Sequence, residues 1–376
     1  CISWLFFLPC QVSSSFILDM LGAASPSKKE ETAKKCGIRQ DDVIAERIIA
    51  AGSIDLGNGA RLPQETLALW ADDVFGQKHV LEFGPRSILT AKVLSSLMPL
   101  SLQAHKFPEM IIALEDGEAY LGINKSLKNS LTVNEFMEGL KAGKAEQYLN
   151  KVHFRAGQAL LVPAYTPHAY GKVRVYEVKA TLPEEDKAGT ISFFDRLRFL
   201  NMRDKWKELG IESLSMSAEK LKEVNKGREN KDILTMDYLT LDSTREFLHQ
   251  AEASGALDPV DPVKFAVKPV ILKNNSKYRN TKLEQIVEVK DRFRVYKYTV
   301  DQGATIQSDE NITGRGHALL VVKGKIGILN ARGRQLNILK KGEECFLTAK
   351  MGGYKIQGLE GVSEVFTQYE PFPAHR

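Results

Sequence analysis

Apolar and polar residues alternate over short segments in two separate parts of the chain. In the first part, the segment LSLQAH alternates Leu and Ala with polar residues that include Gln103 and His105. Similar segments follow within 109–123, 154–171 and 173–182, and Gly and Pro residues punctuate them. Alternation with period two predicts strands, and short strands separated by turns are typical of a small barrel or jelly roll.

The strand pattern returns after residue 262. Five short alternating segments occupy 293–301, 317–329, 335–349, 354–361 and 363–371. Both β parts carry a unit of strand, Gly, polar residue, strand and turn, which indicates a weak internal duplication. The chain is therefore expected to be mainly β, with two jelly-roll β-barrel domains.

Helical spacing is confined to other parts of the chain. It predicts a helix over 41–51, another over 63–75, and several helices over 199–249, before a turn-rich linker at 254–262. A further helix is predicted over 132–149, inserted between strands, with Thr132 as N-cap and Glu135 in the capping-box position.

The composition is that of an ordinary soluble globular protein. Of 376 residues, 52 are Lys or Arg and 47 are Asp or Glu, which gives a net charge of +5. These values exclude a disordered chain or a collagen. The charge is too small to indicate nucleic acid binding but leaves room for a basic pocket that takes a small anion. The four cysteines form no CxxC pair, so we expect no zinc ribbon and a reducing compartment.

The first 21 residues are unusually apolar, with Asp19 as the only charge. Their longest apolar stretch, WLFFL, is too short to span a bilayer. It is similar to the apolar part of a signal peptide, but no basic segment precedes it. We favour a truncated N-terminus over a signal, and no apolar run elsewhere is long enough for a membrane span.

Four side chains form a candidate metal site. Gln103 and His105 lie two residues apart on an expected strand and so share a face. Glu109 follows closely, and His168 lies in the turn-like segment PAYTPHAY. A set of nitrogen and oxygen ligands without cysteine suits a catalytic zinc better than a structural one. Spacing alone does not show that the four converge, and each has a simpler interpretation as a turn or surface residue.

The motifs that contain these residues resemble a known family. They are KVLS from Lys92, PLSLQAH up to His105, PEMIIAL from Pro108 and VPAYTPHAY from Val162. In this order they are similar to type I mannose-6-phosphate isomerase, also called phosphomannose isomerase, of the cupin superfamily. The resemblance covers about residues 88–200 and extends weakly over 285–370.

The resemblance implies a mainly β protein with a helical insert and two cupin domains plus a helical region. The implied divisions are an atypical, partly helical N-terminal region at 1–87, a catalytic cupin domain at 88–198, a helical region and linker at 199–262, and a metal-free cupin domain at 263–376.

The resemblance also implies a set of functional residues. One zinc ion per chain would be bound by Gln103, His105, Glu109 and His168. The remaining site residues would be an active-site lysine, a proton-transfer glutamate and an active-site arginine, which correspond to Lys92, Glu177 and Arg198, with Arg196 as the alternative arginine. His317, in the second β part, has no second ligand at metal spacing and is interpreted as structural.

The implied reaction interconverts mannose 6-phosphate and fructose 6-phosphate through an enediol, with Glu177 or a metal-bound water as base. The partner would be a sugar phosphate, with no nucleic acid or membrane, in a cytoplasmic monomer that serves carbohydrate metabolism and GDP-mannose supply. Two departures favour an alternative, a non-catalytic cupin that binds sugar phosphate or metal: only three residues separate His105 from Glu109, and Phe107 stands where the family has lysine. A third possibility is another metal-dependent cupin enzyme such as an epimerase or dioxygenase.

Overall fold

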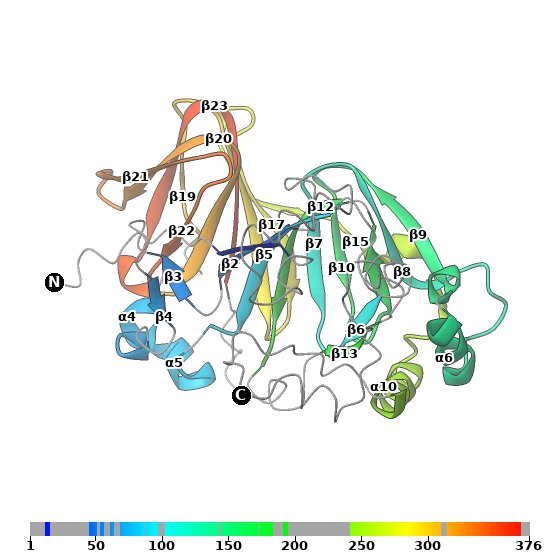
Figure 1. Cartoon of the computed structure of the whole chain (residues 1–376). Coiled ribbons are helices and arrows are strands. Elements are labelled where there is room, and N and C mark those ends of the chain that lie inside the picture. The colour runs from blue at the N-terminus through cyan, green and yellow to red at the C-terminus, as the bar shows by residue number, and fades with distance from the viewer. Residues whose placement is uncertain are drawn as a thin grey trace, which may run out of the picture.

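The computed structural model (Figure 1) contains two β domains that lie side by side. Strands between residues 12 and 267, apart from a separate two-stranded ribbon, build one domain, and strands from 270 onward build the other. The expected mainly β architecture is therefore confirmed. The structure describes residues 12–15, 45–50, 53–55, 61–63, 68–85, 87–96, 102–142, 144–171, 173–182, 191–194, 241–309 and 314–369.

The first domain is a sandwich of two mainly antiparallel sheets. The larger sheet has the order β1-β2-β5-β12-β7-β10-β15, with bounds Val12–Ser15, Ala45–Ala50, Leu89–Ser96, Val173–Ala180, Glu109–Ala113, Ala159–Val162 and Ala266–Val267. The smaller sheet has the order β13-β6-β11-β8-β14, with β9 also paired to β8; its bounds are Ile191–Phe194, Gln103–His105, His168–Tyr170, Gly117–Asn124, Pro259–Val260 and Leu149–Phe154.

The second domain is one strongly bent sheet. Its path is β16-β17-β18-β23-β20-β21, with β19 paired to β23 and β22 to β20. Register shifts interrupt the pairing of β20 with β23, so these two long strands bend and serve both halves of the domain. The bounds are Val270–Asn274, Lys282–Val289, Phe293–Val300, Tyr354–Tyr369, His317–Asn330, Gln335–Lys340, Thr305–Gln307 and Glu344–Leu347. A separate two-stranded ribbon pairs β3 (Ser53–Asp55) with β4 (Arg61–Pro63).

Strands β7 and β12 are apolar on both faces because each face is buried in a different core. Met110 and Tyr176 point into a core between the two domains, whereas Ile111 and Val175 point into the first sandwich. In the core between the domains, Tyr176 stacks on Phe366 at 5.4 Å between ring centroids, and its hydroxyl donates a hydrogen bond to Gln368. Because side chains alternate along a strand, each of these two strands contributes apolar side chains to both cores.

Helices flank the sheets in Figure 1. The helix α6 (Val133–Ala142) packs against α10 (Leu241–Ala253) through apolar residues that include Phe136 and Leu248. Short helices α4 (Ala71–Val74) and α5 (Gln77–Phe83) lie beside the second domain. Single 3₁₀ turns occupy Ala145–Tyr148 (η3), Pro262–Phe265 (η5) and Ala349–Met351 (η7).

The structure confirms one predicted helix start and corrects three predicted spans. Of the helix predicted over 63–75, Pro63 ends β4 and α4 covers only Ala71–Val74. The Thr132 hydroxyl and backbone N–H both donate to the Glu135 carboxylate, and the Glu135 N–H donates back to the Thr132 hydroxyl, as a capping box requires. The predicted helix over 132–149 nevertheless ends early, because Leu149 begins β9. The helix predicted over 41–51 is wrong: 45–50 form β2, since pairing with β5 outweighs the helical spacing of the apolar residues.

Some expectations fall outside the described residues, including most of the helices predicted over 199–249 and both candidate arginines, Arg196 and Arg198. The predicted domain boundaries stay predictions. In the topology, β1 and β2 of the predicted N-terminal region and β15 from 266–267 all join the larger sheet of the first domain. Within the described ranges, no helix is both long and apolar enough to cross a membrane.

Candidate metal centre

Three of the four predicted ligands meet in the space between the two sheets of the first domain. His105 ends β6 and His168 begins β11, which are neighbours in the smaller sheet. Glu109 begins β7 in the larger sheet, opposite them. All three side chains are at most 2% exposed, and one ligand atom of each lies within 4.8 Å of the others.

The Glu109 carboxylate lies between the two imidazoles. Its Oε2 is 2.9 Å from His105 Nε2, and its Oε1 is 3.1 Å from His168 Nε2. The rings lie 5.0 Å apart at 72°. The two histidines therefore present the same nitrogen to opposite oxygens of one carboxylate.

Backbone carbonyls fix the protonation of the other ring nitrogens. His105 Nδ1 is 2.5 Å from the Phe107 carbonyl oxygen, and His168 Nδ1 is 2.8 Å from the Thr166 carbonyl oxygen. A carbonyl only accepts hydrogen bonds, so each Nδ1 must carry the proton and donate it. In a neutral ring, Nε2 then bears a lone pair. Histidines that bind metals through Nε2 are commonly held in this way.

This arrangement leaves a buried nitrogen without a hydrogen bond. His168 Nε2 is close to Glu109 Oε1 but not aligned for a hydrogen bond, and it has no other hydrogen-bond partner among the described residues. Two lone pairs that face each other repel unless a proton or a cation lies between them. Two imidazole nitrogens and a carboxylate are ligands that zinc accepts, so the residues fit a divalent cation.

Protonation partly relieves this repulsion. Burial lowers the pKa of His105 below its usual value. Burial is the largest single influence on the pKa of His168 and lowers it, but the Glu109 carboxylate, the hydrogen bond with the Thr166 backbone and Glu177 together raise it by more, so the net shift is upward. Burial raises the pKa of Glu109, yet the two imidazoles outweigh burial and hold that pKa well below its usual value. Glu109 is thus ionised, as a metal ligand must be.

Gln103, the fourth predicted ligand, lies beside the three. It pairs in register with His168 across β6 and β11, and it shares a face with His105 because the two are separated by one residue. Its role as a ligand stays a prediction.

The short connection between His105 and Glu109 does not prevent convergence. Its three residues carry the chain from the smaller sheet directly to the larger one, so the two ligands face each other across the sandwich. Phe107 is buried in this turn and stacks on His105 at 4.2 Å between ring centroids, and its carbonyl accepts a hydrogen bond from His105 Nδ1. The turn thus positions the histidine ring.

Glu177 and Lys92 lie on the same inner face. They are directly opposite each other on β12 and β5, and Lys92 Nζ is 3.0 Å from Glu177 Oε1. The other carboxylate oxygen of Glu177 is buried and makes no hydrogen bond to any described residue. The structure therefore brings both predicted residues to the centre, whereas Arg198 and Arg196 lie outside the described ranges.

Two residues at the centre were not identified from the sequence. The Tyr170 hydroxyl donates a hydrogen bond to Glu109 Oε1. Lys179 lies in register with Glu109, with its Nζ 3.7 Å from Glu177 Oε1 and 5.6 Å from the centre of the Phe107 ring. The alternation on β11 and β12 could have found both, because Tyr170 and Lys179 lie two residues from His168 and Glu177.

Known proteins share this architecture. Residues 282–363 match the family model of the mannose-6-phosphate isomerase cupin domain. The resemblance to the mannose-6-phosphate isomerase cupin family is confirmed. Among curated proteins, none matches the chain in sequence.

The structural matches extend over nearly the whole chain. A zinc-bound mannose 6-phosphate isomerase superposes with a TM-score of 0.61 at 12% identity, over 97% of this chain and 100% of the other. The Salmonella typhimurium enzyme bound to fructose 6-phosphate and zinc superposes with a TM-score of 0.58 at 14% identity, with the same coverage. At such identity the likeness shows the cupin fold, and the predicted fold class is confirmed.

Proposed function

We propose that the protein is a zinc-dependent aldose–ketose isomerase that interconverts mannose 6-phosphate and fructose 6-phosphate through an enediol. One observation supports this most directly. A buried carboxylate is held between two Nε2 atoms, and a second buried carboxylate, Glu177, with an oxygen that no described residue bonds, comes from a neighbouring strand. The zinc-bound isomerases with the same fold support the same reaction class.

Zinc would be held by His105, Glu109, His168 and Gln103. Bound there, it would supply a fixed positive charge that polarises the substrate oxygens and stabilises the charge of the enediolate. Tyr170 donates to the oxygen of Glu109 that faces His168, and the Phe107 and Thr166 carbonyls orient the two rings. These contacts fix the ligands before any cation binds.

Glu177 would move the proton between C1 and C2 of the sugar. Its Oε1 is 3.0 Å from Lys92 Nζ and 3.7 Å from Lys179 Nζ, and its Oε2, which no described residue hydrogen-bonds, is left to accept a proton. The lysines also place positive charge where a phosphorylated sugar would enter. Lys92 would steer the phosphate together with Arg198.

Chelation tests the metal requirement. Purified protein should contain about one zinc per chain, lose its isomerase rate on treatment with a chelator, and regain it when zinc is added back. The rate is measured with a coupled assay on mannose 6-phosphate. Unchanged turnover in metal-free protein would contradict the proposal.

A second candidate function rests on Phe107, which fills the position of a family lysine with an apolar ring. In this second candidate function, the protein is a cupin that binds zinc or sugar phosphate without turnover. One zinc per chain with no turnover of mannose 6-phosphate or other hexose 6-phosphates would favour this second candidate function.

For the isomerase, we further propose a cytoplasmic, monomeric protein whose product serves GDP-mannose supply.

A further inference from the structure

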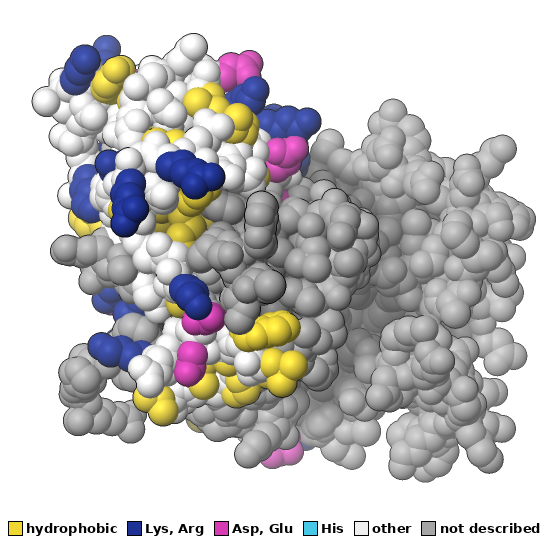
Figure 2. Space-filling model, turned by 90° about the vertical axis from the view of Figure 1, so that its left-hand side faces the viewer, with side chains coloured by type: hydrophobic (Ala, Val, Ile, Leu, Met, Phe, Trp, Pro, Cys, Tyr) yellow, Lys and Arg dark blue, Asp and Glu magenta, His cyan; other side chains and the backbone are white. Residues whose placement is uncertain are grey.

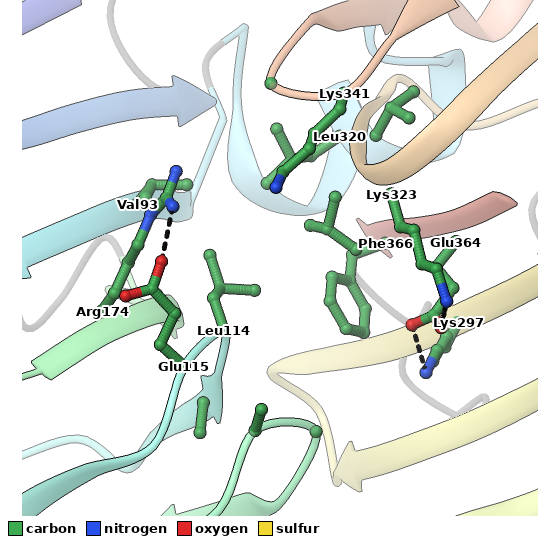
Figure 3. Close-up of a pocket in the computed structure, with 16 residues that line it drawn as sticks. Val93, Leu114, Glu115, Arg174, Lys297, Leu320, Lys323, Lys341, Glu364 and Phe366 are labelled. Carbon is green, nitrogen blue, oxygen red and sulfur yellow. Dashed lines mark hydrogen bonds and ion pairs between the residues drawn. The ribbon is translucent and has the colours of Figure 1, made fainter.

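The two domains leave a cavity of about 900 Å³ between them, at one end of their shared core (Figure 3). Its first wall comes from the ends of β5, β7 and β12, and its second from β18, β20 and β23. The size is within the range of small-molecule sites. Its apolar lining includes Val93, Leu114, Leu320, Val322 and Phe366.

The cavity is distinct from the candidate metal centre. Arg174 lines the cavity, whereas Glu177 on the same strand faces the inside of the first sandwich. Likewise Val93 lines the cavity, and its neighbour Lys92 reaches Glu177. Because side chains alternate along a strand, the larger sheet separates the two sites.

Cationic side chains outnumber anionic ones around the cavity. Arg174 is paired with Glu115 at 2.7 Å, and Lys297 is paired with Glu364 at 2.7 Å. These two pairs neutralise both carboxylates of the lining. The lining has two further cations, which are Lys323 and Lys341.

The two further cations are available to a ligand. Lys323 is 60% exposed, and its Nζ is 3.8 Å from Oε1 of Glu364, a carboxylate whose Oε2 is paired with Lys297 at 2.7 Å. Figure 3 shows the Lys341 ammonium pointing from the turn between β21 and β22 into the cavity, and no described carboxylate forms an ion pair with it. In Figure 2, the Lys and Arg side chains on the described part of an outer face have Asp and Glu side chains among them.

We propose that this cavity binds a phosphorylated organic anion with at least two negative charges and an apolar body. The excess of two positive charges matches a diphosphate, which Lys323 and Lys341 would bind from the second domain. Leu114 and Phe366 would contact the apolar body of the ligand. The proposal does not depend on the isomerase function, because it uses other residues on the other side of the larger sheet.

Calorimetric titration of the full-length protein at low salt tests the proposal, with pyrophosphate, ADP and adenosine as probes. We expect ADP to bind more tightly than pyrophosphate, because only ADP has an apolar ring, and adenosine not to bind measurably. Binding should weaken as salt is added. An equal affinity for ADP and adenosine, or no binding of either phosphate compound at millimolar concentration, would overturn the proposal.

Variants locate the site. Lys341→Met should weaken ADP binding at least about tenfold, since it removes a charge-assisted hydrogen bond to the diphosphate. Lys340→Met is the matched control, because Lys340 is the neighbouring residue, largely exposed, 3.7 Å from Glu343 and absent from the cavity lining. Glu109→Gln tests whether ADP binds at the metal centre instead. An equal loss in the control, or a loss in Glu109→Gln alone, contradicts the assignment.

Discussion

Each of the two β domains buries a histidine in the same local geometry. His168 donates from Nδ1 to the Thr166 carbonyl, and His317 donates from Nδ1 to the Arg315 carbonyl, both at 2.8 Å. Each donation reaches back two residues at the start of a strand. The backbone therefore orients both rings in the same way.

The domains differ in what each Nε2 meets. In the first domain it faces the ionised Glu109, and in the second it accepts a hydrogen bond from the Tyr354 hydroxyl at 3.2 Å. A hydroxyl can donate, so the second site is satisfied by the protein alone. A carboxylate cannot, so the first site is satisfied only with a proton or a cation. The partner of Nε2, rather than the histidine, separates a candidate metal centre from a closed polar core.

The largest expected effect comes from exchanging each histidine for glutamine. His168→Gln should lose bound zinc and isomerase activity, because it removes one ligand nitrogen. His317→Gln should keep both, since the hydrogen bonds of its ring within the described residues are to the Arg315 carbonyl and the Tyr354 hydroxyl. Zinc content by elemental analysis and the coupled isomerase assay measure the difference. Equal zinc content in the two variants would remove the distinction between the domains.

The next effect separates metal binding from proton transfer within the first domain. Glu177→Gln preserves the shape of the side chain but removes the base, so the turnover rate should fall about 10²–10⁴-fold. Zinc content should stay at the wild-type level, because Glu177 is not among the candidate ligands. A variant that loses zinc together with activity would show that Glu177 supports the metal instead.

Acid should destabilise the protein through the second-domain histidine. Burial lowers the pKa of His317 to about 4, from 6.5 in a model peptide. The unfolded chain therefore binds an extra proton between these values, so stability is retained above pH 6.5 and lost as the pH falls toward 4. The loss is about 3 kcal/mol, since one pKa unit corresponds to about 1.4 kcal/mol.

Denaturant unfolding at pH 7 and pH 4.5 measures this effect. The wild-type free energy of unfolding should fall more steeply than that of His317→Gln, which lacks the titrating ring. Parallel decreases in the two proteins would mean that other groups cause the acid sensitivity.

The smallest expected effect concerns the two tyrosines. Tyr170→Phe removes the hydroxyl that donates to Glu109, so zinc affinity should fall about 10–100-fold, as is usual when a contact that supports a ligand is lost. Tyr354→Phe removes the corresponding hydroxyl beside His317 and should leave zinc affinity unchanged. Competition with a chromophoric chelator measures both. Equal affinities in the two variants would place Tyr170 outside the metal centre.

Much of this architecture follows from the sequence. Alternation predicted β6 to β8 and β10 to β12 of the first domain and β18 and β20 to β23 of the second, and the Thr132 and Glu135 pair correctly placed the start of α6. Local pattern failed at 45–50, where apolar residues with helical spacing form β2, because pairing with a distant strand decides the structure there. The sequence motifs identified His105, Glu109 and His168 as candidate ligands. No spacing rule, however, predicts that the three residues between His105 and Glu109 form a turn that joins the two sheets. Tyr170 and Lys179 were missed because their roles depend on contacts across the sandwich.

Strand β12 leaves little room for insertion or deletion. Tyr176 reaches across to Gln368 of the second domain, and its neighbour Glu177 faces the opposite way, toward Lys92. A shift of one residue would exchange the two faces, placing a tyrosine side chain beside the candidate metal centre and a carboxyl group in the apolar core between the domains. Insertions or deletions in this strand should therefore abolish both the packing of the two domains and the proposed isomerase activity. Point substitutions, by contrast, can impair either the packing or the activity alone.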